Sequence, residues 1–171
     1  MIAVLDLDDS ILDLETPLSE VFPSIKTMTI EERYLNRPKI LKAIFEYDLF
    51  ERAKPLPKAI EFLNALRQND IQIVFITARS WHPNAYNISL NNLRSSEIYF
   101  DELIICGLRE DKGDFLNKND RYILSLEDKP HNHINLKERG VEKPYCRVTP
   151  AFDYKKIPEE ELIRCHSEIS I

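Results

Sequence analysis

The chain alternates short, nearly continuous apolar runs with segments of helical periodicity, and this alternation limits its fold more than any other feature. The first four apolar runs have few polar interruptions, which is typical of strands buried on both faces of a parallel sheet. The expected strands are Ile2–Leu7, Ile71–Thr77, Leu103–Cys106, Tyr122–Leu126 and Tyr145–Val148. Helical patterns lie at Pro57–Asn69 and Pro83–Leu93, and shorter ones begin near Gly113 and Pro158. This order predicts an α/β fold, a doubly wound, Rossmann-like parallel sheet with helices on both faces.

The connection between the first two expected strands is much longer than one helix and two loops require. The excess, residues 14–54, contains Thr29 and Glu32 at the spacing of a capping box. It also has a helical stripe of apolar residues at Ile40, Leu41, Ile44, Phe45 and Leu49. Because this stripe needs a packing partner, we expect a small helical cap over the carboxyl edge of the sheet, within one domain that spans residues 1–171.

The composition is that of a globular protein, with 43% hydrophobic and 30% charged residues. A formal net charge of −6 disfavours a general nucleic-acid binder, which normally has a basic stripe. No apolar run approaches the length of a membrane span, and no signal peptide is recognisable. Cys106, Cys146 and Cys165 are widely spaced and fit no metal knuckle. Nothing in their spacing requires disulfides, which favours a reducing, cytoplasmic location.

Two aspartates lie at the carboxyl end of the first expected strand, in the sequence Asp6-Leu7-Asp8-Asp9-Ser10. Alternate side chains of an extended chain point the same way, so the carboxylates of Asp6 and Asp8 are expected to meet at the carboxyl end of the strand. Open α/β sheets bind ligands at that edge. Two carboxylates this close are difficult to keep ionised without a cation or a shared proton. For this motif taken alone, a merely polar exit from the strand is the competing explanation.

The second and fourth expected strands also end in polar residues. Thr77 and Arg79 follow the second strand, where a hydroxyl and a guanidinium can hold a phosphate oxygen. Glu127 and Asp128 follow the fourth strand and lie beside the first acidic pair if the first and fourth strands are neighbours. Such an oxygen-rich cluster favours a hard cation such as Mg²⁺.

Two lysines precede the fourth strand and compete for one role. Lys112 opens the short helix before this strand and can reach inward to offset the carboxylates. Lys118 is also upstream, but it leaves almost no room for a helix before Tyr122. We therefore prefer Lys112 as the lysine of the site.

The ordered set Asp6-x-Asp8-x-Ser10, Thr77, Lys112 and Glu127-Asp128 resembles the four motifs of the haloacid dehalogenase superfamily of phosphatases. The resemblance spans residues 1–132, and the final forty residues add little to it. Within the superfamily, the sequences Thr77-Ala78-Arg79 and Glu127-Asp128-Lys129-Pro130 resemble 5′-nucleotidases and the phosphatase domain of polynucleotide kinases. The usual threonine of the first motif is Ser10 here, which keeps the hydroxyl and loses a methyl group.

This resemblance implies a Mg²⁺-dependent phosphomonoesterase. Asp6 would be the nucleophile that forms an aspartyl-phosphate, and Asp8 would be the general acid and then the base. The substrate-binding residues would be Ser10, Thr77, Ala78, Arg79 and Lys112, and Lys112 would also orient Asp6. Mg²⁺ would be held by Asp6, the backbone carbonyl of Asp8 and Asp128, with Glu127 and Asn132 in support.

The leading candidate partner is a small phosphorylated substrate, a nucleoside monophosphate, with no membrane involved. The alternative is a polynucleotide 3′-end phosphatase, with a channel that would be lined by Arg33, Arg37, Lys39 and Lys42. A phosphoryl-accepting receiver domain also groups Asp, Thr and Lys in a parallel sheet. There, however, the lysine ends the last strand and the acceptor follows a central one, and the order here differs. A non-catalytic binding module is disfavoured because every expected catalytic group is present.

Several aromatic and histidine side chains remain outside these motifs. Trp81 and Tyr86 would either stack on a base or pack at the start of a helix. His131 and His133 flank Asn132 in an expected loop rather than at helical ligand spacing, so we do not expect a zinc site there.

Overall fold

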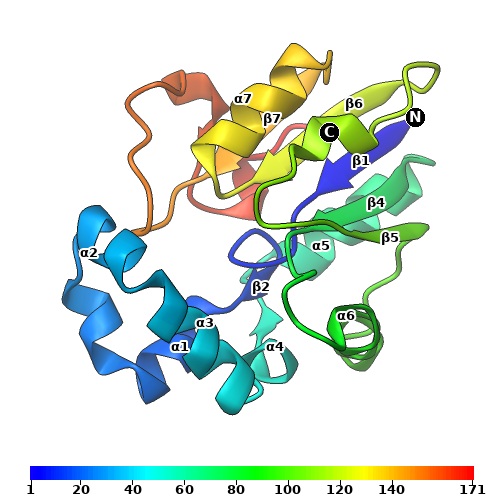
Figure 1. The fold of residues 1–171 in the computed structure, drawn as a ribbon. Coiled ribbons are helices and arrows are strands. Elements are labelled where there is room, and N and C mark those ends of the chain that lie inside the picture. The colour runs from blue at the N-terminus through cyan, green and yellow to red at the C-terminus, as the bar shows by residue number, and fades with distance from the viewer.

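Six parallel strands form one sheet in the computed structural model, which describes residues 1–171, and their order is β5-β4-β1-β6-β7-β8 (Figure 1). In chain order they are β1 (Ile2–Leu5), β4 (Gln72–Thr77), β5 (Glu102–Ile105), β6 (Tyr122–Glu127), β7 (Lys143–Arg147) and β8 (Leu162–Ile163). Strand β1 lies between β4 and β6 and pairs in parallel with both. The predicted doubly wound sheet is confirmed, and the first and fourth expected strands are neighbours.

Helices cover both faces of this sheet. Successive residues of the central strand β1 point to opposite faces, and because these residues are apolar, both faces need a layer of helices over them. The helices that follow the strands are α5 (Ala59–Gln68), α6 (Ala85–Ser95) and α7 (Pro130–Glu138). Leu5 of β1 packs in a cluster of 20 buried residues that includes Leu66 of α5. Its neighbour Val4 packs in a different cluster, with Leu136 of α7. The nearly continuous apolar sequence of β1 is thus explained by burial on both sides.

Most of the expected strands and helices begin or end a few residues away from their predicted bounds. Two of the expected helices are short 3₁₀-helices instead of α-helices. The helix expected near Gly113 is a 3₁₀-helix, η2 (Lys112–Phe115), and the one near Pro158 is η3 (Glu159–Glu161). The second does not close the chain, since β8 and the 3₁₀-helix η4 (His166–Glu168) follow it.

The prediction that His131 and His133 lie in a loop is wrong, because both belong to α7. The buried face of this helix includes Asn132 and His133, with Leu136 as its large aliphatic residue. Polar residues on the buried face hide the apolar period by which a helix is recognised in sequence. Pro130 at the first turn is the signal that was available, since proline favours that position.

Residues 14–54, called here the helical insertion, fold into short helices. These are α1 (Glu15–Val21), the 3₁₀-helix η1 (Pro23–Thr27), α2 (Ile30–Leu35), α3 (Arg37–Glu46) and α4 (Leu49–Arg52). Figure 1 shows them gathered beyond the end at which β1 leaves the sheet. The predicted capping box is present, because Glu32 N–H donates to Thr29 Oγ1 at 3.2 Å and Thr29 N–H donates to Glu32 Oε2 at 2.7 Å.

The apolar stripe predicted for the insertion is divided between two helices. Ile44 of α3 and Leu49 of α4 are buried in a cluster of 7 residues separate from the sheet's clusters, whereas Phe45 is 48% exposed. Two short antiparallel strands, β2 (Leu12–Asp13) and β3 (Lys54–Pro55), join the insertion to the rest of the chain. None of the helices in the structure combines the length and hydrophobicity that a membrane span requires.

Candidate active site

Parallel pairing brings the acidic residues of two distant segments together at the carboxyl edge of the sheet. The N–H of Asp6 donates to the carbonyl of Leu126 at 2.9 Å, which continues the pairing of β1 with β6 beyond the last residue of β1. Asp6 therefore lies beside Glu127 and Asp128 at the end of β6, as the sequence predicts. Thr77 ends β4, the strand on the other side of β1.

Lys112 lies between two of these carboxylates. Its Nζ is 2.7 Å from Asp6 Oδ1 and 2.7 Å from Glu127 Oε1, and all three side chains are only 1% exposed. Burial lowers the pKa of Lys112, but the two carboxylates more than offset this effect and the net pKa is raised. Lys118 is exposed, so of the two lysines considered, the structure places Lys112 in the site.

The Asp6 carboxyl is kept ionised by the lysines around it. Burial raises its pKa, but the charges of Lys112 and Lys129 and the hydrogen bond from Lys112 outweigh burial, and the net pKa is lowered. A buried, ionised carboxylate at the end of a central strand has the state that a nucleophile requires.

The donor atoms at this edge fit a hard divalent cation. One oxygen each from Asp6, Glu127 and Asp128 lie within 4.8 Å of one another. Glu127 is engaged by Lys112 at one oxygen and by Asn132 Nδ2 at the other, at 3.2 Å. Asp6 Oδ2 and Asp128 Oδ1 are buried and accept no hydrogen bond. The ligand atoms without a hydrogen bond are therefore those of Asp6 and of Asp128, whose Oδ1 lies 4.0 Å from Lys129 Nζ, and these are two of the three residues predicted to hold Mg²⁺.

Excess negative charge in this cluster is visible in its pKa values. Burial raises the pKa of Glu127 to about 8 and that of Asp128 to about 7. Lys112 opposes the shift at Glu127, and Lys129 opposes it at Asp128. The lysines do not neutralise the cluster, and a cation at the free oxygens would do so.

Asp8 is not part of this cluster, since its carboxylate is bound to Arg79. Arg79 Nε donates to Asp8 Oδ2 at 2.9 Å, and Nη2 donates to the other oxygen. The guanidinium is fully buried, donates from Nη1 to Ser89 Oγ at 2.9 Å and lies 4.0 Å from the centre of the Phe50 ring in α4. In this structure Arg79 holds Asp8, and its binding of a substrate phosphate stays a prediction.

The two predicted hydroxyl groups are buried without partners. Ser10 and Thr77 are fully buried, and neither Ser10 Oγ nor Thr77 Oγ1 has a hydrogen-bond partner. A buried hydroxyl left unpaired costs about 1–3 kcal/mol, so such groups favour a ligand that completes them. Ala78, between Thr77 and the buried arginine, is half-buried.

Positive charge surrounds the start of α7 and extends to the helical insertion. Burial lowers the pKa of His131, and the charges of Lys129, Lys112 and Arg37 lower it further, while Asp111 opposes them. Arg37 is the first residue of α3, so the insertion contributes a positive charge near His131 at the start of α7. An anionic substrate would meet these charges as it approaches the edge.

Trp81 packs rather than projecting into solvent. It joins the apolar cluster of the insertion, and its ring centre lies 5.7 Å from that of Phe50 and 5.8 Å from that of His82. Tyr86 lies on α6 with 53% of its surface exposed. The structure thus favours packing as the role of Trp81.

Three side chains that the sequence reasoning missed come from the C-terminal segment, residues 143–171. Each meets a backbone carbonyl of a loop that carries the site. The pairs are Arg147 Nη1 with Asp9 O at 2.7 Å, Tyr154 Oη with Asp128 O at 2.9 Å and His166 Nε2 with Ser10 O at 2.7 Å. Burial raises the pKa of Tyr154 to about 12, so its hydroxyl remains a proton donor at neutral pH.

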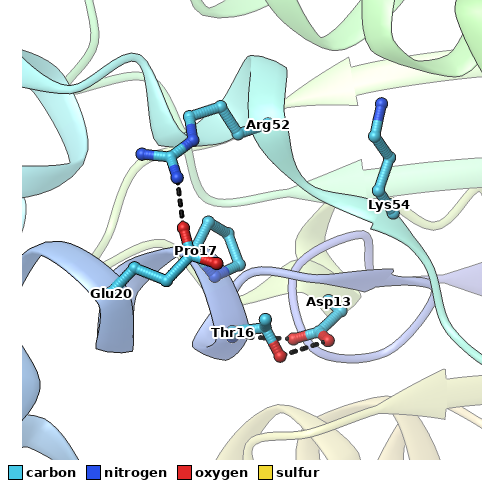
Figure 2. Close-up of a pocket in the computed structure, with 6 residues that line it drawn as sticks. All are labelled: Asp13, Thr16, Pro17, Glu20, Arg52 and Lys54. Atoms are coloured by element: carbon cyan, nitrogen blue, oxygen red, sulfur yellow. Dashed lines mark hydrogen bonds and ion pairs between the residues drawn. The ribbon is translucent and has the colours of Figure 1, made fainter.

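A pocket of about 190 Å³ lies apart from these residues, at the base of the insertion (Figure 2). Its lining residues are Asp13, Thr16, Pro17, Glu20, Arg52 and Lys54. Arg52 is bound to Glu20 and Asp13 to Thr16, as the dashed lines in Figure 2 show. Because none of the predicted site residues lines it, we do not assign the active site to this pocket.

The sequence matches no family model. No curated protein matches it either. The fold, however, is similar to that of haloacid dehalogenase-type (HAD) hydrolases. A protein assigned as a β-phosphoglucomutase from Thermotoga maritima has a TM-score of 0.66 and 18% identity, covering 98% of this chain and 96% of that chain.

Two further structures support the same fold. A HAD hydrolase of family IA, variant 3, from Entamoeba histolytica has a TM-score of 0.66 and 15% identity over 99% of this chain and 95% of that chain. The D,D-heptose 1,7-bisphosphate phosphatase from B. bronchiseptica, solved with magnesium and phosphate, has a TM-score of 0.56 and 12% identity over 98% and 94%. The chain therefore has the haloacid dehalogenase-like α/β fold.

Proposed function

We propose that this protein is a Mg²⁺-dependent phosphomonoesterase with Asp6 as its nucleophile. The observation that carries the proposal is the state of Asp6, which is buried and ionised, held at 2.7 Å by Lys112 and next to the free oxygen of Asp128. The motif order that resembles the haloacid dehalogenase superfamily and the fold shared with its hydrolases support this assignment.

The proposed reaction has two steps. In the first, a carboxylate oxygen of Asp6 forms a bond to phosphorus while the bond from phosphorus to the leaving oxygen breaks, and Asp8 gives that oxygen a proton. In the second, Asp8 takes a proton from water, which attacks the aspartyl-phosphate and restores Asp6. Lys112 and the hydroxyls of Thr77 and Ser10 bind the phosphoryl oxygens. Mg²⁺, bound by Asp6, the Asp8 carbonyl and Asp128, would neutralise charge on the transferring group.

A nucleoside monophosphate is the substrate that we propose within this class. Its support is the resemblance of the Thr77-Ala78-Arg79 and Glu127–Pro130 sequences to 5′-nucleotidases, together with the cations near the cluster. The helical insertion, as a cap beyond the carboxyl end of β1, would restrict the site to small phosphates.

The polynucleotide alternative loses part of its basic channel. Arg33 is buried and bound to Glu15 at 2.6 and 2.9 Å, so it cannot line a channel. Lys42 lies 3.5 Å from Glu46 on the same helix. Arg37 and Lys39 remain exposed and without ion pairs. Two free cations are few for a protein that must hold a nucleic-acid backbone.

The deciding experiment measures hydrolysis of a panel of phosphate esters and one haloacid, with Mg²⁺ and with EDTA. The panel contains nucleoside monophosphates, a 3′-phosphorylated oligonucleotide at moderate salt and 2-chloropropionate, because some structures with a similar fold are dehalogenases. We expect Mg²⁺-dependent release of phosphate, with the larger kcat/KM for a mononucleotide. A larger kcat/KM for the oligonucleotide would replace the nucleotidase assignment with end repair. Release of chloride without release of phosphate would overturn the proposed reaction.

A further inference from the structure

The C-terminal segment, residues 143–171, connects to both loops that carry the acidic groups. Arg147 and His166 reach the carbonyls of Asp9 and Ser10 in the loop after β1. Tyr154 reaches the carbonyl of Asp128 after β6. The chain separates these partners widely, by 156 positions for His166 and Ser10. One segment therefore ties together the two loops whose spacing defines the cluster.

The hydrogen bonds of Tyr154 have a defined direction. The carbonyl of Asp128 can only accept, so the phenol proton points to it at 2.9 Å. Thr149 N–H donates to the phenol oxygen at 3.0 Å, and the Thr149 hydroxyl, also at 3.0 Å, is left to donate as well. The phenol thus makes its one donation to the Asp128 peptide and is itself fixed by two contacts with Thr149.

The backbone carbonyl of Asp128 accepts no hydrogen bond other than the one from Tyr154. Helix α7 begins at Pro130, and the first backbone donor to this loop, His133 N–H, goes to Lys129 rather than to Asp128. The Tyr154 hydroxyl is therefore the group that holds this carbonyl. The backbone carbonyl and the side chain of Asp128 share one α-carbon. Holding the carbonyl therefore restricts the direction in which the Asp128 carboxylate points.

We propose that Tyr154 is a positioning residue for the cation site, holding the Asp128 peptide so that the Asp128 carboxylate stays within reach of Asp6. This inference rests on the proposed function, because it assigns the cation to Asp6 and Asp128. Partners that orient metal ligands typically change metal affinity about 10–100-fold when they are removed. Tyr154 would orient the ligand Asp128 by binding its backbone carbonyl and not its carboxylate.

The test is the affinity for Mn²⁺ alone, measured by electron paramagnetic resonance on the wild-type chain, Tyr154→Phe and Tyr122→Phe. Tyr122 is the matched control, because its hydroxyl also accepts a backbone N–H, from Asn117 at 2.8 Å, but it lies at the opposite end of β6 from Asp128. We expect Tyr154→Phe to bind Mn²⁺ about 10-fold more weakly and Tyr122→Phe to bind as the wild type does. Melting temperatures in EDTA should fall no further for Tyr154→Phe than for the control.

Each other outcome has a definite meaning. Equal Mn²⁺ affinity in Tyr154→Phe and the wild type would overturn the positioning role and leave the proposed phosphatase intact. A wild-type chain that binds neither Mn²⁺ nor Mg²⁺ would overturn both. If Tyr154→Phe does not fold, Thr149→Val replaces it, since that change removes one contact to the phenol and keeps the ring. A smaller loss of Mn²⁺ affinity is expected there, and wild-type affinity would count against the proposal.

Discussion

The sheet and the helical insertion bury apolar side chains to very different extents. The larger cluster of the sheet has 20 buried residues, whereas the cluster of the insertion has 7, one of which, Ile88, belongs to α6. On α2 of the insertion, Tyr34 is 73% and Leu35 69% exposed. Buried, charged side chains such as Lys112 lie at the edge of the sheet, where dense packing keeps them in place. The difference indicates a rigid edge for chemistry beside a less stable helical region that would control access.

The largest effect is expected from a change at the edge of the sheet. Asp6→Asn keeps the shape of the side chain but removes the nucleophile, so kcat for a phosphate ester should fall at least about 1,000-fold. The matched control is Asp70→Asn, since Asp70 is exposed and makes no ion pair. Steady-state kinetics and circular dichroism check both variants. A folded Asp6→Asn variant with near-wild-type turnover would contradict the mechanism.

A leucine-to-alanine change in each region, which creates a cavity of similar size, should show how the stability of the sheet differs from that of the insertion. Leu66 in α5 and Leu49 in α4 are both fully buried leucines in helices. Leu66→Ala should lower the free energy of unfolding by about 3–5 kcal/mol, because the large cluster cannot collapse around the cavity. Leu49→Ala should lower it by less, with faster hydrogen exchange confined to residues 15–52. Urea unfolding and hydrogen exchange measure both effects, and equal global losses would show that the insertion and the sheet unfold as one unit.

The free energy of unfolding should depend on pH in a direction set by the raised pKa values of Glu127 and Asp128. Glu127 and Asp128 have pKa values of about 8 and 7, above the ordinary carboxyl range, because of burial. The folded chain then holds more protons than the unfolded chain between about pH 5 and pH 7. Without metal, the free energy of unfolding should therefore fall as pH rises through this window, on the order of 1 kcal/mol per pH unit. Asp6, whose pKa is lowered, stabilises the fold throughout this window, and its contribution is lost only at lower pH, as the carboxylate becomes protonated.

Urea unfolding in EDTA and in Mg²⁺ at several pH values tests this slope. Mg²⁺ should remove the fall, because it stabilises the ionised carboxylates. Glu127→Gln should reduce the slope in EDTA, since it removes one of the titrating groups and leaves Asp128 and Asp9, whose pKa burial raises to about 8. Stability that rises with pH in EDTA would contradict the excess negative charge assigned to the cluster.

The smallest effect is expected at the helical cap of α2. Thr29→Ala removes the side-chain acceptor for Glu32 N–H, which should cost about 1 kcal/mol of local stability. The exchange rates of amides in α2 should rise, while kcat and the sheet amides stay unchanged. Thr27→Ala is the control, because Thr27 is a nearby exposed threonine whose hydroxyl donates to a carbonyl and caps no helix. If Thr29→Ala and Thr27→Ala raised the exchange rates equally, the capping box would not be what stabilises α2.

The local parts of this protein were readable from its sequence. The apolar runs of β1, β4, β5 and β6 depend on burial on both faces, and burial selects residue types directly. The position of Asp6 at the edge followed from the rule that parallel strands end together. The capping box of Thr29 and Glu32 was recognisable because it is a contact within one turn.

Other features had no local signature. Helix α7 was missed because Asn132 and His133 occupy its buried face, which a hydropathy period does not reveal. Lys112 bridges Asp6 and Glu127, and Arg79 binds Asp8, across separations in the chain that only the folded sheet closes. The resemblance to the haloacid dehalogenase superfamily implied that Lys112 orients Asp6, but the sequence did not predict the pairing of Lys112 with Glu127 or of Arg79 with Asp8.

What the sequence by itself determined is the alternation of β1, β4, β5 and β6 with helices and the set of ionisable groups at one edge, since periodicity and strand ends are local properties. The tertiary structure alone decided how the C-terminal segment braces that edge, through Arg147, Tyr154 and His166. Each of these side chains binds a backbone carbonyl, and every residue type has one. The partner position is therefore free to be any amino acid, so the contact leaves no pattern in the sequence.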